Sequence, residues 1–156
     1  MRIEIVAYDH PDSERLIEDL QQEYVARYGE VDLTPVDPAE FCPPQGLFML
    51  GYLGDEPVAS GGWRVHDAGE EGFEDGDAEL KRMYIVPGQR GNGWSRWMLA
   101  ELESAAALAG RTRLVLETGT KQPEAIGLYL SSGYERIENF GVYRCDPDSR
   151  CFGKAL

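Results

Sequence analysis

The sequence predicts one domain of the α/β or α+β class, built on a mixed central sheet with helices packed against it. Segments that alternate apolar and polar residues, as strands do, are interspersed with segments of helical periodicity. The chain has 156 residues, 42% hydrophobic and 28% charged, which suffices to bury a core and is ordinary for a globular protein. Because it contains neither an internal repeat nor a biased linker, we expect residues 1–156 to form a single domain.

The N-terminal part of the chain predicts a strand followed by a helix. Residues 2–8 alternate in polarity and predict the first strand. Residues 9–29 predict a helix that Asp9 or Asp12 would cap and Gly29 would end. The apolar positions of this helix recur at helical spacing: Leu16, Ile17, Leu20 and Tyr24.

The remainder of the chain predicts a three-stranded meander and then alternating helices and strands. Residues 30–45 carry four prolines and no clear period, so we expect a loop with one short helical turn. Gly54, Asp55 and Glu56 form a tight hairpin signal. A second helix is expected to run from a glycine-rich stretch to about Ala109. The other predicted elements are strands at 46–53, 57–65, 78–86, 113–118, 134–140 and 150–156, and a helix at 122–132.

The stretch PGQRGNGWSRWML, residues 87–99, leads from a strand into a helix. The first N–H groups of a helix lack partners within it and carry partial positive charge. Gly91 and Gly93 would let an anion approach them, and Arg90 adds a formal charge, so the stretch predicts a diphosphate site. It lacks the Gly-Lys-Ser/Thr ending of ATP-binding loops and the three glycines of the dinucleotide fingerprint, which excludes both.

A third pattern fits this stretch. The segment ELKRMYIVPGQRGNGWSRWMLAELE resembles the acetyl-CoA-binding segment of the GNAT family of N-acyltransferases, with Ser95 at the last position of the signature. A second block, LVLETGTKQPEAIGLYLSSGYERI, resembles the strand, helix and strand that follow in that family, with Gln122 where many members have asparagine. The resemblance implies a mixed sheet of six to seven strands with about four helices, and splayed fourth and fifth strands.

The resemblance also implies acetyl-CoA as co-substrate and assigns residues to it. The backbone at the end of the fourth strand would bond the pantetheine arm, and the glycine-rich stretch would hold the diphosphate. The residues so assigned are Met83, Tyr84, Ile85, Arg90, Gly91, Asn92, Gly93, Trp94, Ser95, Arg96, Gln122 and Tyr129. We expect Trp94 and Trp97 to anchor the helix by packing.

The resemblance places the general acid at Tyr129, which stays protonated at neutral pH and can donate to a thiolate; packing or a bond to the CoA sulfur is the alternative role. Glu79 is one candidate for the general base, Glu117 is a second, and an acetyltransferase need not have a strong base. Alternation would place Glu79, Lys81 and Met83 on one face of the fourth strand, and Leu80, Arg82 and Tyr84 on the other.

Charge and composition limit the classes of partner that we expect. The net charge of −13 argues against nucleic acid as a partner. Residues 66–79 are strongly acidic and predict either a solvated loop or a negative rim that attracts a cationic amine. No membrane helix or signal peptide is apparent, so we expect a cytoplasmic protein. Cysteines 42, 145 and 151 lack the spacing of a zinc site, and we predict no metal.

We therefore expect an N-acetyltransferase that acts on a primary amine of a small molecule, by direct attack in a ternary complex. Acetylation of a protein N-terminus or lysine, and a non-catalytic acyl-CoA-binding module, remain alternatives. A homodimer is common in the family, although no residue here specifies one. His10 and His66 are expected at the surface, and Tyr24, Tyr28 and Trp63 are expected to pack in the core or at the rim of the acceptor pocket.

Overall fold

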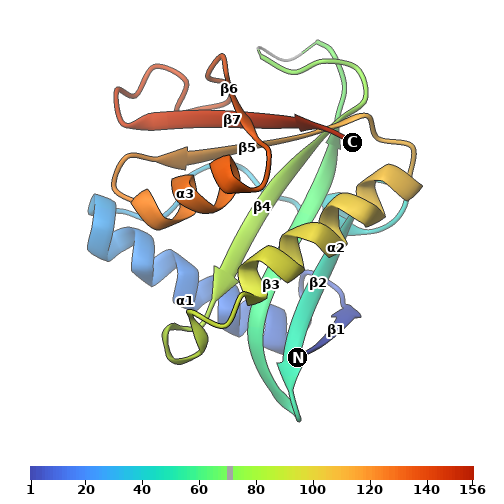
Figure 1. Ribbon diagram of the computed structural model, residues 1–156, viewed down its shortest axis with the longest axis vertical. Coiled ribbons are helices and arrows are strands. Elements are labelled where there is room, and N and C mark those ends of the chain that lie inside the picture. The colour runs from blue at the N-terminus through green and yellow to red at the C-terminus, as the bar shows by residue number, and fades with distance from the viewer. Residues whose placement is uncertain (70–71) are drawn as a thin grey trace.

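The computed structural model describes residues 1–69 and 72–156, which form one seven-stranded sheet with helices on both faces (Figure 1). The strand order is β1-β2-β3-β4-β5-β7-β6. Neighbouring strands are antiparallel except β4 and β5, which are parallel, so the predicted mixed sheet is confirmed. The strands are β1 (Arg2–Ile5), β2 (Gly46–Leu53), β3 (Glu56–His66), β4 (Asp77–Ile85), β5 (Arg113–Gly119), β6 (Glu135–Ile137) and β7 (Ser149–Ala155).

Within the described residues the structure has three α-helices, where about four were expected: α1 (Pro11–Tyr28), α2 (Trp94–Leu108) and α3 (Pro123–Ser131). Two short 3-10 turns accompany them, at Pro38–Phe41 and Pro87–Gln89. The first of these turns is the short helical turn predicted within the proline-rich loop.

The start of α1 differs from the prediction in its cap. His10 Nδ1 accepts the hydrogen bond from the backbone N–H of Asp12 at 3.0 Å, so neither Asp9 nor Asp12 is the capping residue. The Asp12 carboxylate instead accepts from the Tyr52 hydroxyl at 2.8 Å. At the other end, Gly29 adopts a left-handed φ of 85° and ends the helix as predicted.

Alternation along the strands produces two cores, one on each face of the sheet. Figure 1 shows α2 and α3 on one face and α1 behind the other. Leu47 and Met49 of β2 pack on the face of α2, whereas Phe48 and Leu50 pack on the face of α1. A side chain at Gly61 would collide with Leu102 and Met83, so glycine there lets α2 lie close to β3.

A bulge interrupts β4 at Arg82, which has a positive φ of 60°. The register between β3 and β4 shifts between Ser60 and Gly62, and β4 holds the extra residue. The shift reverses the faces of the residues that follow it. Met83 packs into the core beneath α2, while Tyr84 packs into the core beneath α1.

The predicted strict alternation of β4 is therefore wrong beyond Lys81. Leu80, Met83 and Ile85 share the face of α2. Arg82 lies on the face of α1, where its Nε donates to the Tyr8 hydroxyl at 3.2 Å. A bulge depends on the fit of neighbouring strands, and a pattern of period two cannot reveal it.

Candidate active site

The parallel seam between β4 and β5 is short, and the strands then splay apart. Only three rungs join them, at Asp77↔Arg113, Ala78↔Leu114 and Glu79↔Val115. Beyond these rungs β5 continues along β7 while β4 stays with β3 (Figure 1). The closed end is fixed by the Arg113 guanidinium, which donates two hydrogen bonds of 2.7 Å to the fully buried Asp77 carboxylate.

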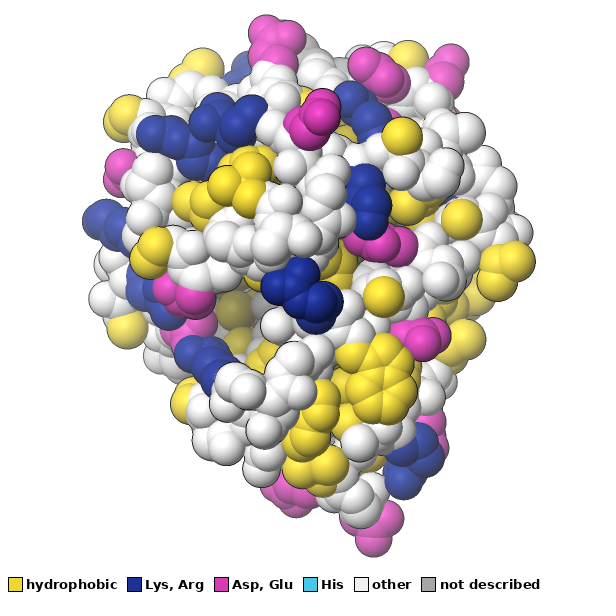
Figure 2. Space-filling model, viewed as in Figure 1, with side chains coloured by type: hydrophobic (Ala, Val, Ile, Leu, Met, Phe, Trp, Pro, Cys, Tyr) yellow, Lys and Arg dark blue, Asp and Glu magenta, His cyan; other side chains and the backbone are white. Residues whose placement is uncertain are grey.

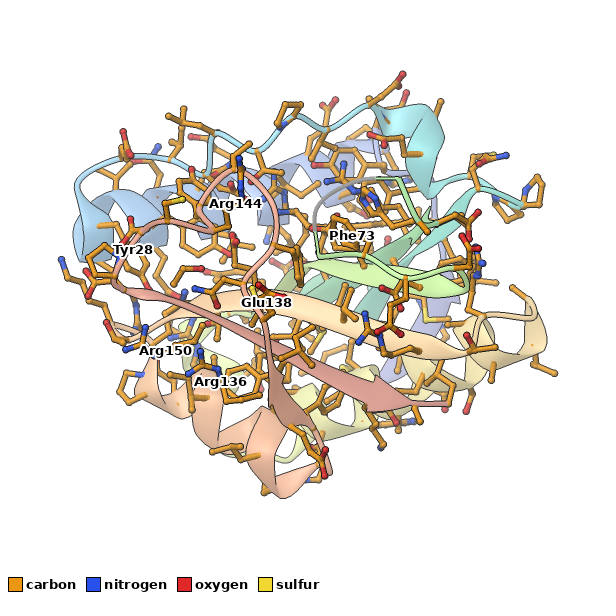
Figure 3. The ribbon with its side chains drawn as sticks, turned by 90° about the horizontal axis from the view of Figure 1, so that it is seen from above. Tyr28, Phe73, Arg136, Glu138, Arg144 and Arg150 are labelled. Atoms are coloured by element: carbon orange, nitrogen blue, oxygen red, sulfur yellow. The ribbon has the colours of Figure 1, made fainter. Side chains whose placement is uncertain are left out.

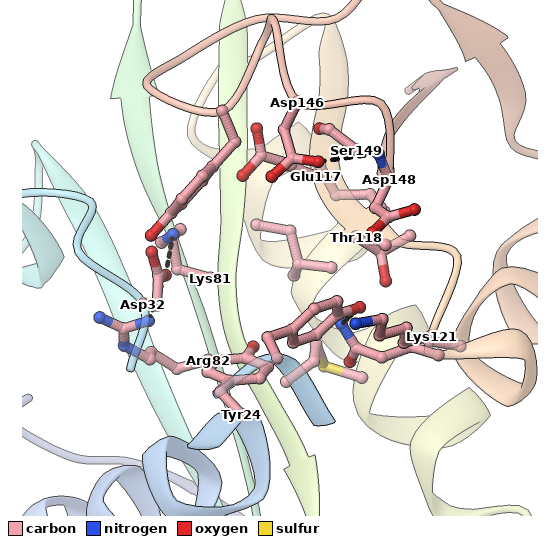
Figure 4. Close-up of a pocket in the computed structure, with 18 of the residues that line it drawn as sticks. Tyr24, Asp32, Lys81, Arg82, Glu117, Thr118, Lys121, Asp146, Asp148 and Ser149 are labelled. Atoms are coloured by element: carbon pink, nitrogen blue, oxygen red, sulfur yellow. Dashed lines mark hydrogen bonds and ion pairs between the residues drawn. The ribbon is translucent and has the colours of Figure 1, made fainter. Parts of the chain in front are cut away.

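The splay opens into a cavity of about 250 Å³ (Figure 4). Strand β4 lines one wall with residues 79–83, and β5 lines the other with residues 116–119. The rest of the wall comes from the end of α1, from residues 30–32 after that helix, from α3 and from the loop before β7. The residues that line the cavity include Tyr24, Tyr28, Asp32, Lys81, Arg82, Glu117, Gln122, Tyr129, Tyr143, Asp146, Asp148 and Ser149.

The glycine-rich stretch forms an open loop in front of α2. Gly91 and Gly93 have left-handed φ values of 85° and 77°, and a Cβ on either would have no atom within 4 Å. Gly93 stands at the N-cap of α2, and no side chain caps the helix there. The loop therefore leaves the first N–H groups of α2 without a side-chain acceptor and with space before them, which fits a diphosphate.

The arginines of this stretch have partners within the protein. Arg90 Nε donates to the Ile85 carbonyl at 2.9 Å, and its Nη2 contacts Glu23 Oε1 at 2.7 Å. Arg96 donates to the hydroxyls of Ser131 and Ser132 at 2.9 and 3.0 Å, which ties α2 to α3. Basic side chains nevertheless lie around a hollow in the face that carries these helices (Figure 2).

The other predicted residues of the segment 87–99 differ in how deeply their side chains are buried. Trp94 is partly buried against the core beneath α2, as predicted. Trp97 is 43% exposed and its Nε1 donates to Glu101 at 3.2 Å, so the prediction that it packs as an anchor is wrong. Asn92 is exposed and donates to the Gln89 carbonyl at 3.2 Å.

Helix α3 brings Gln122 and Tyr129 to the cavity. Gln122 Nε2 donates to the Tyr28 hydroxyl at 3.1 Å, so this side chain joins α3 to the end of α1. Tyr129 is buried, with its ring 5.6 Å from that of Tyr134, and burial raises the pKa of its hydroxyl above the usual value. Tyr129 therefore stays protonated at neutral pH.

Glu79 is buried and held by two partners. Its Oε1 accepts from Arg64 Nε at 2.8 Å and contacts His66 Nε2 at 3.0 Å. Burial alone would raise the pKa of Glu79, but the hydrogen bond to His66 and the charges of Lys81 and Arg64 lower it to about 2. A carboxylate with so low a pKa is a weak base.

The environment of His66 differs from the surface position that the sequence suggested. Its side chain is 13% exposed, and its ring stacks on Phe73 with 4.0 Å between the ring centroids. Phe73 lies in the acidic stretch 66–79, and no pattern in the sequence indicated this aromatic contact. The other histidine, His10, is the cap of α1.

Glu117 lines the same cavity as Glu79, but its surroundings shift its pKa in the opposite direction. Burial, aided by the charges of Asp32 and Glu79, raises its pKa to about 7 despite the opposing charge of Lys81. Its Oε2 is buried and has no hydrogen-bond partner among the described residues. The two candidate bases, Glu79 and Glu117, therefore differ in pKa, a difference that sequence spacing could not reveal.

The sequence missed a charged cluster that closes one side of the cavity. Asp32 Oδ2 accepts from Lys81 Nζ at 2.9 Å and from Arg82 Nη1 at 2.8 Å. Lys81 and the charge of Arg82 hold the pKa of Asp32 below its usual range although burial acts against them. The cluster fixes the segment after α1 to the bulge of β4, and only the bulge brings both cations to one carboxylate.

The loop between β6 and β7 meets the segment after α1 above the cavity. The Leu33 N–H donates to the Tyr143 hydroxyl at 2.7 Å. Figure 3 shows this loop, which carries Arg144, reaching toward the segment between α1 and β2. Of the aromatic residues singled out in the sequence, Tyr24 and Tyr28 line the cavity, whereas Trp63 is buried in the core beneath α2.

The described acids of the stretch 66–79 are mostly bound within the protein. Asp67 contacts Arg111 at 3.0 Å, and Asp75 Oδ1 accepts from the Ala68 N–H at 2.7 Å. Of the described acidic residues in this stretch, only Glu79 lines the cavity, which argues against a negative rim formed by it. Residues 70–71, which also belong to that predicted rim, lie outside the described residues.

Comparisons with known proteins agree with this arrangement. The family model for the acetyltransferase (GNAT) family matches residues 13–134. An IAA acetyltransferase of Azospirillum brasilense is 40% identical over 142 residues, which cover 91% of this chain and 89% of that protein. Within the described residues, no helix combines the length and apolar character needed to cross a membrane.

Solved structures show the same fold. A Klebsiella pneumoniae protein described as an acyl-CoA N-acyltransferase is 29% identical, with a TM-score of 0.78 and coverage of 99% of this chain and 97% of that one. The PaiA N-acetyltransferase of Thermoplasma acidophilum, solved in complex with coenzyme A, has a TM-score of 0.72 at 15% identity, with both chains fully covered. The match of the family model and the identity to the Azospirillum enzyme show that the chain belongs to the GNAT family of acetyltransferases, whose co-substrate is acetyl-CoA.

Proposed function

We propose that the protein transfers the acetyl group of acetyl-CoA to a primary amine of a small molecule, by direct attack while both substrates are bound. The observation that carries this proposal is the position of Glu117 and Tyr129 around one cavity. Tyr129 packs on the face of β5 that carries Leu116, and Glu117 alternates to the face of Val115. A proton acceptor and a proton donor thus face the gap from its two sides.

The proposed binding of acetyl-CoA uses the open loop and the splayed edge of β4. The N–H groups from Gly91 to Arg96 would hold the diphosphate, since space lies before both glycines. The pantetheine arm would bond the backbone of Met83, Tyr84 and Ile85, where the Ile85 carbonyl already accepts one hydrogen bond from Arg90. When bound, acetyl-CoA supplies an activated carbonyl carbon and a thiolate leaving group.

Glu117 is the proposed general base. An acceptor amine arrives mostly protonated and must lose a proton before its nitrogen can form the new C–N bond. The buried, unpartnered Oε2 of Glu117 can accept that proton, and a pKa of about 7 suits the transfer near neutral pH.

Tyr129 is the proposed general acid. The breaking C–S bond leaves negative charge on sulfur, and the Tyr129 hydroxyl would donate its proton there. Its raised pKa keeps that proton available across the neutral range. We assign Glu79 no part in proton transfer, because Arg64 and His66 bind its Oε1 and its pKa is about 2.

Release of thiol from acetyl-CoA across a panel of small amines tests the proposal. Turnover with small amines at neutral pH is the expected result. Turnover with peptides alone would instead favour acetylation of protein N-termini or lysines. Stabilisation of the protein by acetyl-CoA without turnover on any amine or peptide would favour a non-catalytic acyl-CoA-binding module.

A cytoplasmic location and a homodimeric assembly complete the proposal. Dimers are common in the family, which supports the assembly, and the net charge of −13 supports the absence of a nucleic-acid partner. Light scattering at several protein concentrations tests the assembly, and a monomeric mass throughout would contradict the dimer.

A further inference from the structure

The charged side chains that line the cavity are unevenly distributed. Among the described residues, six carboxylates line it, from Glu30, Asp32, Glu79, Glu117, Asp146 and Asp148, against three cations, from Lys81, Arg82 and Lys121. Lys81 and Arg82 are bound to Asp32, and Glu79 is bound to Arg64 and His66. Once these contacts are set aside, four carboxylates remain opposite Lys121 among the described lining residues, so the cavity favours a cation.

Three lining residues have a buried polar side-chain atom without a hydrogen-bond partner among the described residues: Glu117, Thr118 and Ser149. Glu117 and Ser149 indicate where a ligand nitrogen would sit. Ser149 is 5% exposed and lines the cavity, yet its Oγ has no hydrogen-bond partner among the described residues; the same is true of Glu117 Oε2. Ser149 pairs with Gly119 and Cys151 with Glu117, so the Ser149 and Glu117 side chains share one face of neighbouring strands. A buried hydroxyl and carboxylate without partners are costly unless a ligand satisfies them, and an amine nitrogen can donate to both.

Asp146 and Asp148 stand in the loop before β7, next to this position (Figure 4). Asp146 Oδ1 accepts from the Asp148 N–H at 2.8 Å, and Asp148 Oδ1 accepts from the Thr120 hydroxyl at 3.0 Å. These bonds orient both carboxylates and leave one oxygen of each for another partner. The neighbouring Arg150 donates to the Pro147 and Ser149 carbonyls and does not line the cavity.

We propose that the acceptor is a small diamine or polyamine, an inference that rests on the proposed acetyltransferase function. The nitrogen to be acetylated lies between Glu117 and Ser149, and a second, protonated nitrogen lies against Asp146 and Asp148. An amine that carries a carboxylate would instead meet these carboxylates with like charge, and the substrate class is therefore cationic rather than zwitterionic.

Three acceptors of similar length test the inference: 1,4-diaminobutane, butylamine and 4-aminobutanoate. We expect kcat/KM for the diamine to exceed that for butylamine by about fivefold to tenfold, the range that contacts with partly exposed carboxylates can supply. The amino acid should be the poorest acceptor. The advantage of the diamine should shrink as ionic strength rises, because salt screens exposed charges.

Two double variants locate the effect. Asp146→Asn with Asp148→Asn should bring the diamine-to-butylamine ratio of kcat/KM close to one. Glu135→Gln with Glu138→Gln removes the same charge from exposed residues outside the cavity and should leave the ratio as in the parent protein. An unchanged ratio in the aspartate variant, or an equal loss in the glutamate variant, would contradict the proposed site.

Ser149→Ala provides a separate check on the position of the reacting nitrogen. Because this hydroxyl has no hydrogen-bond partner among the described residues, its removal should raise the KM for the amine while the Kd for acetyl-CoA changes little. An unchanged KM would contradict the role of Ser149. Turnover of none of the three amines contradicts both the inference and the proposed function, whereas butylamine turnover that equals or exceeds diamine turnover contradicts the inference alone.

Discussion

Glu117 and Tyr129 acquire opposite proton roles from the same physical cause. Burial disfavours the charged form of each and so raises the pKa of both. For the carboxyl group the rise brings the pKa to about 7, where the group can accept and release a proton. For the phenol the rise moves the pKa further from neutrality, so that the hydroxyl stays protonated at neutral pH.

Replacing Glu117 with glutamine removes the proposed base and retains the shape of the side chain. We expect kcat/KM to fall about 100-fold, the scale of general-base catalysis. In the parent protein kcat/KM should rise with pH through about 7, since the carboxylate is the active form, and this rise should vanish in the variant. An unchanged pH profile would exclude Glu117 as the base.

The same substitution should affect stability in the opposite direction. The pKa of Glu117 rises from 4.5 to about 7 on folding, so the native state binds the extra proton and stability falls as pH increases between these values. Glu117→Gln removes this penalty of about 1–3 kcal/mol. Thermal unfolding should show a gain in Tm at pH 8 that is absent near pH 4.5; equal changes at both pH values would contradict the raised pKa.

Tyr129→Phe keeps the buried ring and deletes only the hydroxyl. Turnover should fall about tenfold to 100-fold because the leaving thiolate loses its proton donor. Calorimetry should show little change in the Kd for acetyl-CoA, since packing of the ring against Tyr134 remains. Full retained turnover would remove Tyr129 as the acid.

At the scale of the element, the loop before α2 combines backbone conformation with binding. Gly93→Val should weaken acetyl-CoA binding strongly, because φ is 77° there and the new side chain would fill the space before the helix. Gly110→Val is the matched control, with a φ of 83° and equally open surroundings at the far end of α2. Both should lose stability, and calorimetry should show loss of affinity only for Gly93→Val; unchanged affinity would exclude the loop as the cradle.

The helices and strands could be predicted from the sequence more fully than the face of the sheet on which each side chain lies. The glycine-rich stretch and the block from Gln122 to Tyr134 indicated the family from sequence alone, because the residues of each motif lie close together along the chain. The pairing of Lys81 and Arg82 with Asp32 requires the bulge of β4 and so escaped the pattern. Spacing alone left Glu79 and Glu117 equivalent, because burial and the partners Arg64 and His66 exist only in the folded chain.

At the scale of the whole molecule, the sheet consists of two antiparallel parts joined by the three parallel rungs of β4 and β5. The Arg113–Asp77 contact lies at this junction, and Asp77 is fully buried. Arg113→Ala should destabilise the protein by about 3–5 kcal/mol, because it leaves a buried carboxylate without its cation. Denaturant unfolding measures the loss, and a change below about 1 kcal/mol would contradict the importance of the contact.

The two parts of the sheet divide the chemistry between them. Glu117 lies on β5, and Tyr129 packs against Phe152 of β7, so both proton-handling groups belong to the part formed by β5 and β7. The proposed pantetheine edge belongs to β4, in the other part. Movement of these two parts away from each other would widen the gap and admit or release a bulky molecule. The base and the acid would keep their mutual spacing, because both belong to the same part.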